Sequence, residues 1–82
     1  MATTIPMLVQ WFNDGVDLGA THMIVVCDTF DWEDFPVYVM STEDALEKFG
    51  ELHEHNMQKV MEVYNLRLDR DDQMAEWRAF HF

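Results

Sequence analysis

The residues best suited to chemistry in this 82-residue sequence are carboxylates, and their densest group lies in one short stretch. Four acids there alternate with aromatic side chains: the acids are Asp28, Asp31, Glu33 and Asp34, and the aromatics are Phe30, Trp32 and Phe35. Such acids could bind a hard cation such as Ca²⁺ or Mg²⁺, although the spacing is not that of an EF-hand and the stretch has no glycine. They could instead pair with arginines of a protein partner, with Trp32 as the anchor. In a third interpretation the aromatics fold onto the core and the acids are simply solvated.

A second group of acids has the spacing of a helix surface. Steps of four, four and three residues separate Glu43, Glu47, Glu51 and Glu54, so on a helix they form one stripe. Four helical residues rise about 6 Å, which is close to the spacing of phosphates along one DNA strand. The stripe could therefore occupy the nucleic-acid groove of a basic protein, or it could be an ordinary solvated helix face.

The overall charge decides which partners suit these acids. The chain has 16 Asp and Glu against 5 Lys and Arg, which gives a formal net charge of -11. Proteins bind nucleic acid and anionic membranes by placing Lys and Arg on phosphates, so both partners are disfavoured. A basic protein surface or a metal ion is favoured instead.

Other reactive side chains do not form a recognisable catalytic pattern. Cys27 lies in the apolar run MIVVC and is expected to be a small buried hydrophobe. His53 and His55 are two residues apart and would point to opposite sides of a helix, so they cannot share a metal there. We therefore expect no enzyme and no cofactor. The alternative function is a small ligand-binding or divalent-metal-binding protein that uses the acids of residues 28–34 with His22 or His53.

Two helices and two strands are expected to position the acids, followed by a last short helix. The first helix is capped by Thr3 or Thr4, has Pro6 in its first turn, and ends at Gly19. Residues 22–28 form a strand that is apolar on both faces. The acidic aromatic stretch is the following loop, and the second strand begins at Pro36 or just after it.

The chain after the second strand is expected to be helical. Ser41 or Thr42 caps a long helix over residues 42–65, because apolar residues recur there at helical spacing. Its apolar residues are Ala45, Leu46, Phe49, Leu52, Val60, Met61, Val63 and Tyr64. A last helix begins near residue 71, with Asp69, Asp71 or Asp72 as its cap. Met74, Trp77 and Phe80 are expected on one side of it.

These elements predict a single α+β domain over residues 1–82, in the order α-β-β-α-α, with a β-hairpin packed against the long helix. A two-stranded hairpin is marginally stable alone, and its first strand is apolar on both faces. We therefore expect a homodimer, formed by pairing edge strands or by packing the long helices.

The stretch GATHMIVVCDTFDWEDFPVYV, residues 19–39, resembles a short uncharacterised family found in tailed bacteriophages and prophages. The resemblance extends to Met61-Glu62-Val63-Tyr64-Asn65-Leu66 and implies no catalytic residues. It implies a small early protein in the cytoplasm of a bacterial host, and small acidic phage proteins are often inhibitors of CRISPR effectors and restriction enzymes. The expected localisation is cytoplasmic, since the sequence has neither a signal-peptide pattern nor a long apolar run. The expected function is inhibition of a basic, nucleic-acid-binding host defence protein through the two acidic groups.

Overall fold

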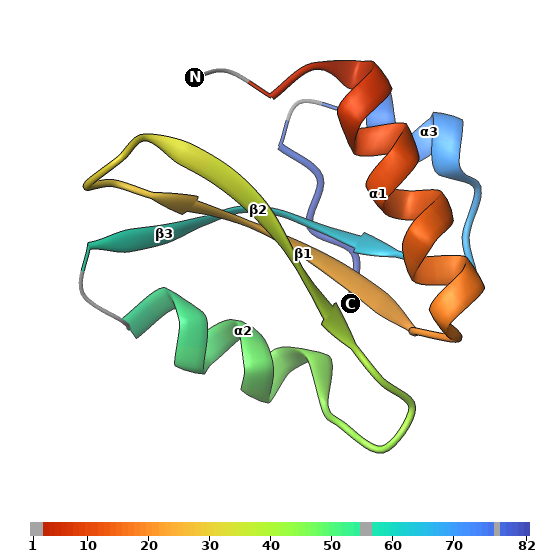
Figure 1. Ribbon diagram of the computed structural model, residues 1–82. Coiled ribbons are helices and arrows are strands. Elements are labelled where there is room, and N and C mark those ends of the chain that lie inside the picture. The colour runs from red at the N-terminus through yellow and green to blue at the C-terminus, as the bar shows by residue number, and fades with distance from the viewer. Residues whose placement is uncertain (1–2, 55–56, 77) are drawn as a thin grey trace.

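The computed structural model describes residues 3–54, 57–76 and 78–82, and it is an α+β domain built on an antiparallel sheet (Figure 1). Its elements are α1 (Ile5–Leu18), β1 (His22–Asp28), β2 (Glu33–Val39), α2 (Ala45–Glu54), β3 (Gln58–Asn65) and α3 (Arg70–Met74). The strand order is β2-β1-β3, so β1 is central. The expected fold class is confirmed, and the order of the first four elements is as predicted.

The first helix forms as the sequence predicts. The Thr4 side chain accepts a hydrogen bond from the Met7 N–H, Pro6 lies in the first turn, and Gly19 adopts a left-handed conformation with φ of 79°. Leu8 and Phe12 are buried on the side of α1 that faces the sheet. The helix therefore covers one face of the sheet through residues at helical spacing.

Two separate apolar cores lie on opposite faces of the sheet. On one face, Met23 and Val25 of β1 pack with residues of α1 and with Tyr64 of β3. On the other face, Ile24 and Val26 of β1 pack with Ala45, Phe49 and Leu52 of α2 and with residues of β2 and β3. The double-sided apolar pattern of β1 is thus accounted for by helices on both faces, as Figure 1 shows.

The predicted helix over residues 42–65 is wrong over residues 58–65, which form strand β3. The pairing of β3 with β1 contains a β-bulge: Val26 pairs with Val60, whereas Val25 pairs with Glu62. The bulge adds one residue, so Val60 and Val63 face α2 although they are three apart, while Met61 and Tyr64 face α1. A bulged strand therefore reproduces the spacing of a helix in the sequence.

Two other boundaries differ from expectation. Strand β2 begins at Glu33 and continues through Pro36, which pairs with Val25. Proline is tolerated there because β2 is an edge strand, where the missing N–H can face away from the neighbouring strand. Helix α2 begins at Ala45, and its cap is Asp44 in place of Ser41 or Thr42, since the Asp44 carboxylate accepts from the Glu47 N–H at 3.0 Å.

The C-terminal part of the chain crosses to both faces of the sheet. Helix α3 is capped by Asp69, one of the three predicted candidates, and Met74 packs into the α1 core. Phe80 forms a parallel bridge with Val63 of β3, and the Phe80 and Phe82 rings meet Phe49 of α2 edge-on at centroid distances of 6.1 and 5.4 Å. The prediction that Met74 and Phe80 share one side is wrong, and Trp77 lies outside the described residues.

The observations that led us to predict a homodimer are met within one chain. The third strand completes the sheet, and α1 and α2 cover its two faces. The outer edge of β2 also contains Pro36 and the charged Glu33 and Asp34, which are features that oppose strand pairing at an edge. The homodimer therefore stays a prediction, but neither the marginal hairpin nor the two-sided apolar strand supports it any longer.

Gly15 of α1 lies close to Tyr38 of β2 and to Leu66, and it provides a stability test. A Cβ atom there would lie 2.8 Å from both Leu66 Cδ1 and Tyr38 Cε1. We expect Gly15→Ala to lower the free energy of unfolding by about 1–3 kcal/mol, measured by urea denaturation. Gly50→Ala is the matched control, because no described atom beyond its chain neighbours and its own helix backbone lies within 4 Å of the added methyl. It should raise stability by about 0.5–1 kcal/mol. Equal effects of the two changes would show that the close approach is not important.

Candidate protein-interaction site

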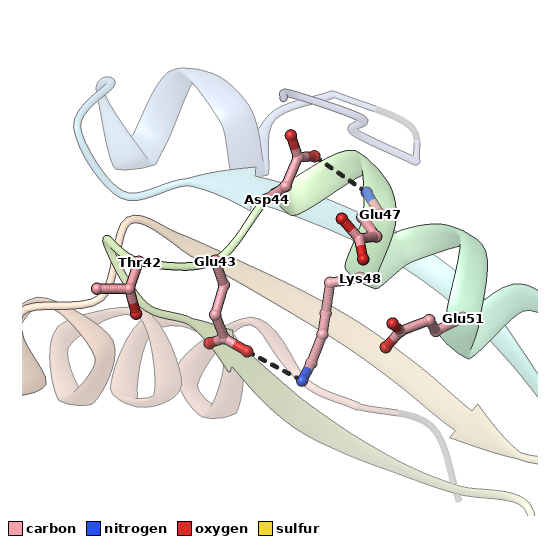
Figure 2. A pocket seen from close by; sticks show the side chains of 6 residues that line it. All are labelled: Thr42, Glu43, Asp44, Glu47, Lys48 and Glu51. Carbon is pink, nitrogen blue, oxygen red and sulfur yellow. Dashed lines mark hydrogen bonds and ion pairs between the residues drawn. The ribbon is translucent and has the colours of Figure 1, made fainter.

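The start of α2 forms the more structured of the two acidic groups. Six residues line an open pocket of about 320 Å³, shown in Figure 2: Thr42, Glu43, Asp44, Glu47, Lys48 and Glu51. Four of the six are acids, and Lys48 is the one cation among them. We name this group the α2 acidic pocket.

Local hydrogen bonds fix the shape of the α2 acidic pocket. The Met40 N–H donates to the Glu43 carboxylate at 3.0 Å, and the Lys48 ammonium lies 3.2 Å from its other oxygen. The Met40 N–H and then Lys48 hold the pKa of Glu43 below its ordinary value. Glu43 is thus ionised and oriented, whereas the exposed Glu47 and Glu51 have no ion pair among the described residues.

The tip of the β1–β2 hairpin forms the second group. The Asp28 carboxylate accepts hydrogen bonds from the Phe30 and Asp31 N–H groups, at 2.8 and 3.4 Å. The Trp32 N–H donates to the Asp28 carbonyl at 2.6 Å, and Trp32 has a left-handed φ of 58°. Asp28 therefore holds the turn that displays two aromatic side chains: Phe30 is 72% exposed and Trp32 is 59% exposed.

The acids of the hairpin do not converge. Asp31 and Glu33 are exposed, Asp28 is engaged by the turn, and Asp34 accepts a hydrogen bond from the Thr3 hydroxyl beside Cys27. In the described ranges, which include all of residues 28–34, no three His, Cys, Asp or Glu side chains are grouped so that they could hold a metal ion. The metal-binding alternative therefore gains no support from the geometry of this loop.

The two histidines of the metal-binding alternative, His22 and His53, do not lie beside the acids of the loop. His22 begins β1 and Asp28 ends it, and six residues of strand span about 20 Å. His53 is exposed and stacks on Phe49, with ring centroids 5.4 Å apart. His55 lies outside the described residues.

Cys27 is buried, as its apolar surroundings predicted. It lies on the α1 face of β1, opposite Asp34 and Lys59 on the neighbouring strands. Burial and then the adjacent Asp34 raise the pKa of the Cys27 thiol. The thiolate, which is the nucleophilic form, is therefore disfavoured at this position.

The predicted glutamate stripe is only partly a helix stripe. Glu47, Glu51 and Glu54 lie on α2 and are exposed, but Glu43 precedes the helix and Glu54 is its last residue, outside the α2 acidic pocket. The pocket and the hairpin tip lie at opposite ends of β2, which is about 20 Å long. The two acidic groups are therefore connected along the length of β2 and are not one compact patch.

Three residues of this region have positions that the sequence did not predict. Asp44 was not singled out, although an acid three residues before Glu47 is a common helix cap. Lys48 has no role in the sequence prediction, yet it lies inside the pocket. Phe35 was grouped with the loop, but it belongs to β2 and is 37% exposed there.

No family model, curated protein or solved structure matches this chain. Among the described residues, none of the helices has the length and apolar character needed to cross a membrane.

The contacts of Glu43 allow a direct test of the pocket's electrostatics. We expect Lys48→Gln to raise the pKa of Glu43 while leaving it below its ordinary value, because the Met40 N–H bond, the larger cause, is retained. NMR titration of the side-chain carboxyl resonance would measure the change. An unaltered Glu43 pKa in this variant would contradict the ion pair, and Lys59→Gln on β3 is the control for loss of one positive charge elsewhere.

Proposed function

We propose that this protein binds and inhibits a basic, nucleic-acid-binding bacterial protein of the host defence class, and that the α2 acidic pocket and the hairpin tip make the contacts. The observation that supports this most is the pocket itself, in which four acids surround a single lysine on an open surface. The resemblance to phage proteins supports the bacterial host and the phage origin.

The charge distribution supports a basic partner in preference to nucleic acid. Lys48 is already paired with Glu43, so the pocket offers Glu47 and Glu51 to incoming cations. Carboxylates arranged in this way bind arginine and lysine, accelerate association, and exclude nucleic acid from the surface they cover. The proposal therefore describes inhibition by occupation of a basic surface, without any catalytic step.

The hairpin tip adds the apolar part of the contact. Exposed aromatic side chains beside acids are typical of the few residues that dominate the binding energy of an interface. Phe30 and Trp32 are both more than half exposed, with Asp31 and Glu33 adjacent in the chain. We propose that the protein acts in the cytoplasm of the bacterial host, where its target would be.

The test is capture of basic proteins from bacterial lysate at low salt, followed by a salt step and mass spectrometry. Two double variants remove two charges each from the proposed contacts: Glu47→Gln with Glu51→Gln, and Asp31→Asn with Glu33→Gln. The matched control, Asp14→Asn with Asp17→Asn, removes two charges from exposed positions of α1. We expect each contact variant to lower the affinity for a captured basic protein about tenfold, and the control to change it less than about twofold.

Two results would contradict the proposal. Equal losses in all three variants would mean that only net charge matters. If the folded protein captures no basic, nucleic-acid-binding protein at low salt, the proposed class of target is wrong.

A further inference from the structure

Among the described residues, one strip of the sheet on the α2 face has no helix directly over it. Helix α2 packs on β3 and β1, and β2 lies beyond it at the edge of the sheet. Residues alternate along β2, so Phe35 lies on the same face as Val37 and Val39, which pack into the α2 core. Val39 is fully buried at one end, but Val37 is half-buried and Phe35 is 37% exposed toward the hairpin.

The flank of α2 that carries Lys48 and Glu51 lies toward this strip, whereas Glu47 points farther from the sheet. Phe80 and Phe82, which come from the segment beside β3, contact Phe49 from the flank of α2 that is farther from β2. Lys48 and Glu51 lie on the opposite flank, and Figure 2 shows their side chains extending from α2 on the side that looks toward β2. An apolar strip on β2 is thus bordered by Lys48 and Glu51 of α2 on one side and by Glu33 at its end.

We propose that the uncovered strip of β2 and the acidic flank of α2 form one docking surface for a basic amphipathic helix of the partner. This inference rests on the proposed function and specifies which face makes the contact and what binds there. The apolar side of the docked helix would cover Phe35 and Val37. Its Lys and Arg side chains would meet Glu47 and Glu51.

The spacing of the elements suits a helix at this place. Packed helices lie about 8–10 Å apart, and adjacent strands lie about 4.8 Å apart. A helix packed beside α2 would therefore be displaced from α2 by about two strands. This displacement places it over β2. Glu47 and Glu51 are four residues apart on α2, so they match Lys or Arg side chains that are four residues apart on the incoming helix.

Charge decides which kind of molecule can bind the proposed docking surface. A second copy of this chain has a net charge of -11 and would bring acids against acids. An anionic lipid or nucleic-acid surface would meet the same repulsion. A basic helix is attracted, and Lys48 is the one residue of the α2 acidic pocket that opposes it.

The test uses a synthetic peptide of about 18 residues of Leu and Lys, ordered to form an amphipathic helix, and a scrambled peptide of the same composition. We expect the patterned peptide to shift the amide resonances of Phe35, Val37, Glu47 and Glu51 in the labelled protein. Affinities would be measured by fluorescence anisotropy at low and high salt. The scrambled peptide should bind at least about tenfold more weakly, because it has no continuous apolar side.

Three variants and one control make the expected pattern specific. Phe35→Ser should weaken binding about tenfold, and Glu47→Gln with Glu51→Gln should do the same. Lys48→Gln should tighten binding about threefold or more, because it removes the opposing charge and releases Glu43. Asp14→Asn with Asp17→Asn on α1 should change the affinity less than about twofold. Circular dichroism melting would confirm that Phe35→Ser is folded, and Lys48→Gln alters only a surface position.

The inference is overturned if the patterned peptide does not bind, if its shifts map to other surfaces, or if Phe35→Ser and Lys48→Gln leave the affinity unchanged. A natural basic partner whose binding is lost only in the hairpin variant would overturn it while leaving the proposed function standing. Failure to capture any basic protein, with the peptide bound as expected, would contradict the proposed function and leave the docking surface standing.

Discussion

The structure depends on the burial of β1 on both faces. Met23, Ile24, Val25 and Val26 are almost fully inaccessible to solvent, and each alternate pair belongs to a different core. One strand therefore joins two apolar layers that would otherwise be too small to be stable alone. The requirement for cover on both sides explains why α1 and α2 lie on opposite faces, and why the ends of β2 and the start of α2 are left to form the polar surface.

The sequence was a sound guide where local chemistry decides structure and a poor one where pairing decides it. The cap at Thr4, the stop at Gly19 and the limits of β1 follow from single residues and short patterns. Strand β3 could not be predicted from such patterns, because its bulge gives apolar residues a helical spacing. Pairing with β1 overrides the local preference, and pairing is set by residues far away in the chain.

The candidate site shows the same division. The acids, their net charge and Trp32 are visible in the sequence, but their grouping is not. Asp28 is engaged by local hydrogen bonds and Asp34 by the Thr3 hydroxyl far away in the chain. Glu43, Glu47 and Glu51 share a pocket because Asp44 caps α2 and the helix begins at Ala45. The exposed face of Phe35 depends on where α2 lies over the sheet, which only the β2-β1-β3 order determines.

The position of the C-terminal segment has a consequence for how the chain folds during synthesis. Phe49 of α2 is covered in part by Phe80 and Phe82, which are translated more than thirty residues later. Until those residues leave the ribosome, α2 can rest on the hairpin only with part of its apolar side open to water. The surplus of negative charge then keeps partly made chains apart, so the same acids that suit a basic partner also protect the nascent protein from aggregation.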